Sequence, residues 1–206
     1  MDKSTVYDLL VEILPPDRAE RLCNRLYHAF GTTERIMRAL CEDLMTVEGV
    51  DSAVASYFPL VCALASRRRC EGFGIGDTFS ESAFVRYLSG IFLGTSVENV
   101  YLFSIGEADT VVGIDVIGRG SVNTSHVAVR LALETALRRN AREVIVAHNH
   151  PGGVCRPSMD DLRTTNALAA AFRSVGMRLR SHYIVAGDSF ERIAESEIPS
   201  AESVIS

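Results

Sequence analysis

The first 70 residues place apolar side chains at the spacing of α-helices. Ala19, Leu22, Leu26 and Phe30 recur three or four residues apart, which is typical of a helix that buries one face. Prolines and glycines separate such runs, because proline disfavours a helical residue before it and glycine accepts the left-handed conformation of a C-cap. The pattern predicts no strand before residue 70 and four helices, over residues 4–14, 17–30, 33–47 and 54–64.

The pattern changes after residue 98. Residues 99–105 and 110–118 are short runs of β-branched and aromatic residues, and the turn 106–109 between them predicts a hairpin. Strands alternating with helices around a partly antiparallel sheet predict an α/β or α+β sandwich. Further strands are expected over 143–148 and 178–187, and helices over 80–92, 124–139 and 158–176.

A segment rich in glycine and turn-forming residues, 71–80, separates these two patterns. We therefore predict two domains, a helical one over residues 1–73 and an α/β one over residues 74–206. The chain after Glu191 is expected to fray.

Composition narrows the class of protein. Of 206 residues, 47% are hydrophobic and 23% charged, which excludes a largely disordered chain. No apolar stretch is long enough to span a membrane and no signal-peptide pattern opens the sequence, so we expect a cytoplasmic protein with reduced cysteines. The net charge is −5, which does not match the basic footprint of a nucleic-acid-binding domain.

The strongest candidate for chemistry is His148-Asn149-His150-Pro151, followed by Ser158 and Asp161. Two histidines separated by one residue at a strand end point to the same side. A carboxylate from the next helix would complete three ligands, and three N/O ligands with an open fourth position are typical of catalytic zinc. Asp160 also lies in that first helical turn, about 100° away around the axis, and spacing alone does not choose between the two.

A catalytic zinc site also needs a base to take a proton from water. Among Glu98, Glu107, Glu134 and Glu143, Glu98 is favoured because it opens the first strand beside an apolar run, where burial would raise its pKa. Of the remaining histidines, His126 and His182 are interpreted as structural. His28 is expected on the surface of the helical region.

Glu98, His148-x-His150, Ser158 and Asp161 together resemble the JAMM motif of JAB/MPN metalloproteins. The run HNHPGGVCRPSMDD is similar to the signature of the RadC-type subfamily. The helical segment 123–141, the segment HYIVAG at 182–187 and the first 70 residues also resemble that subfamily, so the resemblance covers about residues 5–190.

The resemblance implies a JAB/MPN-like mixed-sheet domain, a cytidine-deaminase-like sandwich, preceded by a small all-α helix-hairpin-helix-like domain. It implies Zn²⁺ held by His148, His150 and Asp161, with metal-activated water attacking a peptide or isopeptide bond of a peptide or protein substrate. Glu98 would act as general base and then as acid to the leaving amine. Ser158 would donate a hydrogen bond to the oxyanion.

The chain departs from the subfamily in places. Val154 and Cys155 stand where it usually has Asp-Pro, and Leu131 where it often has Glu, but none of these is a metal ligand in the pattern. In the hairpin-like segment 46–51, Asp51 replaces a glycine and brings a carboxylate to where a DNA phosphate would bind. Two alternatives stay open: a DNA-associated module in which the metal site is secondary, and a non-catalytic metal-binding scaffold for a protein partner.

Overall fold

The computed structural model describes residues 3–120 and 125–194. Contacts divide the chain into two compact units, Met1–Arg67 with Leu93–Ser96, and Arg68–Phe92 with Val97–Ser206. The predicted domain boundary between residues 73 and 74 stays a prediction. Among the described residues, no helix combines the length and hydrophobicity that a membrane crossing requires.

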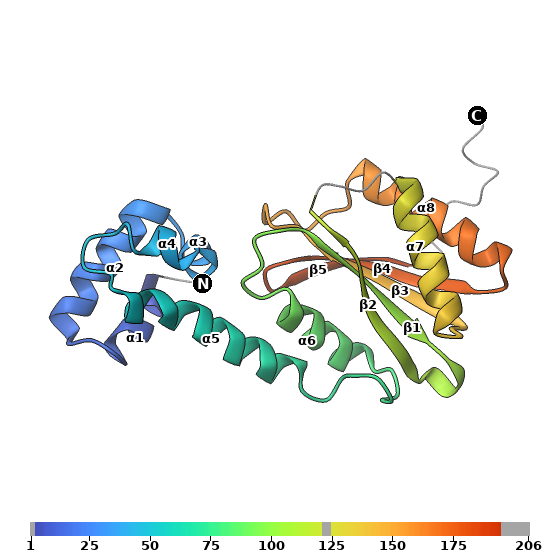
Figure 1. Cartoon of the computed structure of the whole chain (residues 1–206), viewed down its shortest axis with the longest axis horizontal. Helices are drawn as coiled ribbons and strands as arrows, with labels where there is room; N and C mark the ends of the chain where they lie inside the picture. The colour runs from blue at the N-terminus through green and yellow to red at the C-terminus, as the bar shows by residue number, and fades with distance from the viewer. Residues whose placement is uncertain (1–2, 121–124, 195–206) are drawn as a thin grey trace. The chain divides into compact units, whose positions relative to one another are not determined.

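The first unit is built from helices, and its described residues include no strand. Pro16 begins α2, where its missing N–H leaves no hydrogen bond unmade. Leu10, Leu26, Ile36 and Phe58 are completely buried and form the centre of its core. The helices are α1 (Lys3–Val11), α2 (Pro16–Phe30), α3 (Thr33–Arg38), α4 (Cys41–Leu44) and α5 (Ser52–Cys70) (Figure 1).

The prediction of one helix over 33–47 is wrong, because α3 and α4 are separated by two extended residues, Ala39 and Leu40. The Cys62 thiol donates to the Met37 carbonyl at 3.6 Å, and that carbonyl would accept from Cys41 N–H in a continuous helix. The other helices differ from prediction only in their ends: α1 stops earlier, and α5 is longer on both sides.

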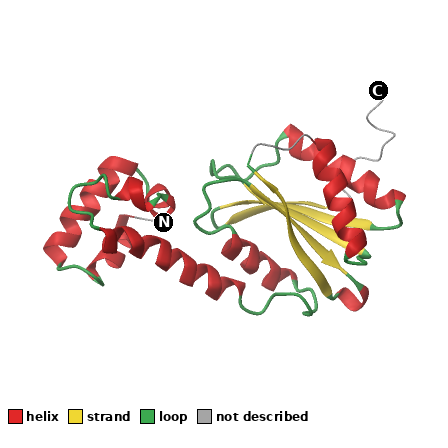
Figure 2. Cartoon of the chain, in the orientation of Figure 1, coloured by secondary structure: helices red, strands yellow, loops and turns green. Residues whose placement is uncertain are grey.

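The second unit contains a five-stranded mixed sheet in the order β2-β1-β3-β4-β5, in which only β3 and β4 pair in parallel. Helix α6 (Glu81–Ile91) lies on one face of this sheet, and helices α7 (Ser125–Arg138) and α8 (Met159–Ser174) lie on the other (Figures 1 and 2). The predicted mixed α/β architecture is therefore confirmed. The strands are β1 (Asn99–Ile105), β2 (Val111–Arg119), β3 (Glu143–Asn149), β4 (Arg178–Ala186) and β5 (Ser189–Ala194).

Strand β5 was not expected, and the predicted fraying after Glu191 is wrong for the residues up to Ala194. Gly187, with φ of +60°, supports the tight turn that brings β5 back antiparallel to β4. Ile193 is buried, which fixes the register of this edge strand. The expected fraying of residues 195–206 lies outside the described residues.

Strand β3 is buried on both faces, and its alternation positions the candidate site. Ile145 and Ala147 face the aromatic cluster around α6, whereas Val144 and Val146 pack with α7 and α8. His148 continues the second series with the strand period of two, so its side chain emerges on the α7–α8 face.

Candidate metal centre

The two histidines come from the end of β3 and the residue just beyond it. His148 is the next-to-last residue of β3, and the backbone N–H of His150 donates to the Val185 carbonyl of β4 at 2.8 Å. This bond continues the parallel pairing past the end of the strand. The backbone of His148 and His150 is therefore anchored by sheet hydrogen bonds.

Asp161 comes from the first turn of α8 and is aimed by the helix cap. The Ser158 hydroxyl accepts from the Asp161 N–H at 3.1 Å, and the Asp161 carboxylate accepts from the Ser158 N–H at 2.7 Å. Asp160 instead pairs with Arg163 at 3.1 Å, and both of these side chains are exposed. The structure thus brings Asp161, and not Asp160, to the histidines.

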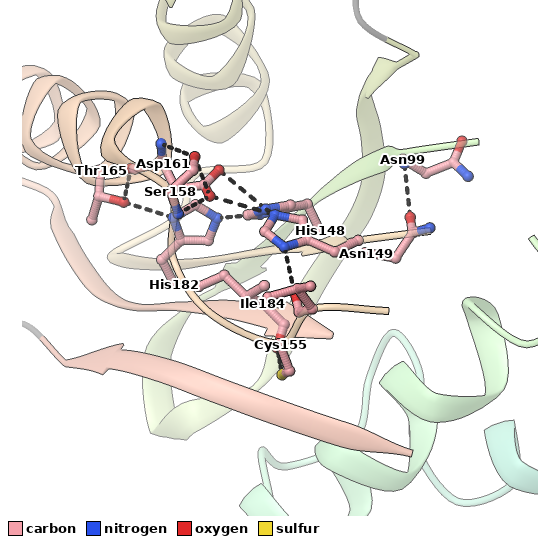
Figure 3. Close-up of polar contacts among 11 residues, drawn as sticks. Asn99, His148, Asn149, Cys155, Ser158, Asp161, Thr165, His182 and Ile184 are labelled. Carbon is pink, nitrogen blue, oxygen red and sulfur yellow. Dashed lines mark hydrogen bonds and ion pairs between the residues drawn. The ribbon is translucent and has the colours of Figure 1, made fainter. Parts of the chain in front are cut away.

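The three candidate ligands converge through atoms that can bind a cation. Figure 3 labels two of them, His148 and Asp161. The His148 Nε2 and His150 Nε2 atoms lie 2.8 Å apart. The Asp161 carboxylate oxygens lie 3.1 Å from His148 Nε2 and 3.4 Å from His150 Nε2. Ligands bound tetrahedrally to zinc lie about 3.3 Å from one another, so this donor set fits one small divalent ion after shifts of a few tenths of an ångström.

His150 is oriented by the loop that follows it. Its Nδ1 atom lies 2.8 Å from the Val154 carbonyl oxygen. Because a carbonyl only accepts, Nδ1 carries the proton, and in the neutral tautomer of this ring the lone pair of Nε2 faces His148 and Asp161. The departure from the subfamily at residue 154 leaves this bond intact, because the backbone supplies it.

The electrostatics of the centre favour an ionised carboxylate. Burial raises the pKa of Asp161, but the contact with His148, whose ring donates to the carboxylate when it is protonated, and the hydrogen bonds from Ser158 outweigh it, so the pKa lies well below its usual range. The side chain of Asp161 is only 15% exposed and that of His148 only 2%. A negative charge therefore faces the histidines in a region largely screened from water.

Ser158 also holds the carboxylate directly, since its hydroxyl donates to Asp161 Oδ2 at 2.6 Å. The single hydroxyl proton is thereby used within the site. The oxyanion role predicted for Ser158 would require the hydroxyl to turn from Asp161 to a substrate.

Glu98 directly precedes β1 and is partly buried. Val100 pairs with His148, so continuing the antiparallel register by two residues places Glu98 opposite His150. Its carboxylate does not belong to the described His148–His150–Asp161 group, and its role as base stays a prediction.

Asn149, which separates the two histidines, ties this segment to β3. Its side-chain oxygen accepts from the Asn99 N–H at 2.8 Å (Figure 3). Its side-chain nitrogen donates to the Val97 carbonyl at 3.1 Å. Asn149 therefore forms hydrogen bonds with the backbone on both sides of Glu98. The sequence analysis assigned no role to this residue.

The other glutamates weighed as bases are paired with arginines away from this group. Glu134 pairs with Arg130 along α7. Glu107 pairs with Arg142, and Glu143 with both Arg178 and Arg180.

His28 is exposed on α2, and the side chain of His126 lies outside the described residues. His182 is different: it is buried on β4, with its Nε2 atom 2.8 Å from His148 Nδ1. Burial, and then the charge of His148, lower the pKa of His182 to about 3, so it is neutral at pH 7. The sequence offered one signal for it, a histidine inside an otherwise apolar strand.

Cys155, the other departure from the subfamily, points its thiol at the Ile184 carbonyl at 3.4 Å. Burial is the largest influence on this thiol and raises its pKa, so it stays protonated at pH 7. We therefore assign Cys155 a packing role.

A helix-flanked mixed sheet that carries a His-x-His pair at a strand end and an aspartate in the next helix defines a JAB-type domain. The chain belongs to the RadC family: residues 79–198 match the family model of the RadC-like JAB domain. A UPF0758 protein of Cupriavidus pinatubonensis is 30% identical over 86% of this chain and 78% of the relative. UPF0758 proteins of Chromobacterium violaceum and Thiobacillus denitrificans are 30% and 32% identical, over 86% and 83% of this chain and 80% and 77% of those relatives.

Proposed function

We propose that this chain is a zinc-dependent hydrolase of peptide or isopeptide bonds. The observation that carries the proposal is the convergence of two imidazole nitrogens and a carboxylate within 2.8–3.4 Å of one another. Electron pairs and a negative charge at such distances repel one another unless a proton or a metal cation lies among them. Two nitrogens and one oxygen that leave a fourth position open are the ligand set of catalytic zinc sites.

Zinc in this position would supply a Lewis acid that lowers the pKa of water to about 7. His148, His150 and Asp161 would hold the ion. Glu98, which the strand register places opposite His150, would accept a proton from the attacking water and return it to the leaving amine. Since the Ser158 hydroxyl donates to Asp161, we propose that its first role is to hold that carboxylate, with oxyanion stabilisation conditional on its release.

The accompanying assignments rest on the same resemblance and on sequence. They are a peptide or protein substrate as partner, the cytoplasm as location, a cytidine-deaminase-like description of the sheet domain, and a helix-hairpin-helix-like first domain over residues 1–73. A DNA-binding role finds no support in the hairpin segment. Asp51 accepts from the Val54 N–H at 2.9 Å and pairs with Arg18, so it occupies an amide at the start of α5 that could bind a phosphate.

Metal content gives the first test. Untagged protein, purified after growth with zinc, should contain about one zinc per chain. His150→Ala should lose this zinc, whereas His28→Ala, which changes an exposed histidine on α2, should retain it. Absence of metal from the wild-type protein after zinc is supplied would overturn the proposal.

Turnover gives the second test. A peptide and isopeptide library should be cleaved by the zinc-loaded protein, and Glu98→Gln should abolish cleavage while keeping the zinc. Bound zinc without cleavage of any library member would favour the non-catalytic scaffold instead.

A further inference from the structure

A chain of hydrogen bonds runs from His148 into the interior of the second unit (Figure 3). His148 Nδ1 lies 2.8 Å from His182 Nε2, and His182 Nδ1 lies 2.7 Å from Thr165 Oγ1. The Thr165 hydroxyl donates to the Asp161 backbone carbonyl at 2.6 Å. His182 is 3% exposed and Thr165 is 1% exposed, so bulk water does not compete for these bonds.

The bond to the carbonyl determines the direction of the others. Because a carbonyl only accepts, the single hydroxyl proton of Thr165 is used on Asp161. Thr165 Oγ1 must then accept from His182 Nδ1, and neutral His182 has a lone pair on Nε2. That lone pair accepts a hydrogen bond from His148 Nδ1, so in the neutral form of His148 the Nε2 atom is unprotonated and faces His150 and Asp161.

The opposite direction conflicts with the geometry. If His182 donated from Nε2, its Nδ1 would need the proton of Thr165. The Thr165 and Asp161 oxygens would then face each other at 2.6 Å with no proton between them, which is repulsive.

We infer that His182 and Thr165 are positioning residues that fix His148 in the tautomer whose Nε2 atom can bind a metal. The purpose of this arrangement rests on the proposed metal site, whereas the direction of the hydrogen bonds holds in the metal-free protein. Histidines that bind metals usually donate their other N–H to a carboxylate, a carbonyl or water, and the second partner fixes the ring. Here a neutral imidazole takes that place, and α8 supplies both Thr165 and the ligand Asp161.

The tautomer of His182 is measurable without metal. In protein labelled with ¹⁵N and freed of metal by chelation, long-range ¹H–¹⁵N correlation of the imidazole rings should show neutral His182 protonated at Nδ1. A ring protonated at Nε2 would overturn the inference.

Zinc affinity tests whether this chain of hydrogen bonds positions His148 for metal binding. Thr165→Val keeps the shape of the side chain but removes the acceptor for His182 Nδ1, and we expect the dissociation constant for zinc to rise about 10- to 100-fold. Thr165→Ser restores the hydroxyl and should bind zinc as the wild type does. Thr135→Val, at a buried threonine of α7, is the matched control and should leave the affinity unchanged.

Competition with a chromophoric chelator at constant pH gives these affinities, and circular dichroism confirms that each variant is folded. Equal affinities for wild type and Thr165→Val, or equal losses in Thr165→Ser and Thr135→Val, would overturn the positioning role. If the wild type binds no zinc, the proposed hydrolase fails, but the ring spectrum of His182 still decides the direction of the hydrogen bonds.

Discussion

The two ends of strand β3 are both polar, but their charges are handled in opposite ways. At the start of the strand, the Glu143 carboxylate accepts from Arg178 and Arg180, and Arg180 also pairs with Asp109. At the other end, the Nε2 atoms of His148 and His150 face each other and a carboxylate. One end is neutralised by arginines of the chain itself, whereas at the other end we propose that a cation completes the group.

This difference separates a structural ion-pair network from a candidate centre of chemistry. Both carboxylates have a lowered pKa. For Glu143, burial raises the pKa, but the hydrogen bonds from Arg178 and Arg180 lower it by a larger amount. Arginines are always protonated at neutral pH, so Arg178 and Arg180 neutralise the Glu143 carboxylate without a bound ion. A neutral histidine whose Nε2 atom faces the carboxylate donates no proton to it. The lowered pKa of the carboxylate is common to both ends of β3, so it does not distinguish them.

The largest effect should come from the same chemical change made at each end. Asp161→Asn removes the negative ligand, and we expect zinc affinity to fall by at least about 100-fold, because even second partners of metal ligands contribute 10- to 100-fold. Glu143→Gln should leave zinc affinity within about 2-fold, since its partners are arginines remote from the histidines. Chelator competition measures both, and equal losses would contradict the distinction between the two ends.

Asn149 offers the next test, because it is an internal polar bridge at the histidine end. Asn149→Ala leaves the Asn99 N–H, in a residue only 8% exposed, without its acceptor, so the free energy of unfolding should fall by about 1–3 kcal/mol. Asn149 also forms hydrogen bonds with the backbone on both sides of Glu98, the proposed base. The rate of hydrolysis should therefore fall more than zinc affinity does.

Urea denaturation of the metal-free protein measures the stability change. Asn166→Ala, at a partly buried asparagine of α8, is the control and should cause no loss. An unchanged stability of Asn149→Ala would show that the bridge to Asn99 contributes nothing.

The proximity of two histidines and an aspartate could be predicted from the sequence, because spacing, strand period and helix start bring His148, His150 and an aspartate of the first turn of α8 together. The choice of Asp161 over Asp160 depended on the resemblance, and the capping bonds of Ser158 now give it a physical reason. His182 and Asn149 were missed because their partners belong to other strands and to α8. Such partners follow only from the sheet order and register.

The fold shows the same limit. The hydrophobic pattern of the sequence predicts strands β1 to β4. Strand β5 instead depends on its pairing with β4 and on the turn at Gly187. The break between α3 and α4 likewise depends on a thiol from α5, far along the chain. Local patterns therefore predict elements, and long-range hydrogen bonds decide where they end.

Ser158→Ala tests how the carboxylate is held at the histidine end. Loss of the helix cap should lower the free energy of unfolding by about 1 kcal/mol. Release of the carboxylate should weaken zinc binding about 10-fold, and Ser158→Thr should restore both. If Ser158 acts mainly on an oxyanion, the alanine variant would instead keep its zinc affinity and lose only kcat.

The smallest effect should come from the compensated end and should depend on pH. Because the folded-state pKa of Glu143 lies below the usual 4.5, the unfolded chain binds more protons between the two values, and stability rises with pH there. The excess stability of wild type over Glu143→Gln should thus be about 1 kcal/mol at pH 7 and diminish as pH falls below about 4.5. Asp160→Asn, in an exposed pair with Arg163, should show almost no difference at either pH. Urea denaturation in the presence of a chelator measures this, and a difference that persists undiminished at pH 3 would mean that packing, and not charge, holds the start of β3.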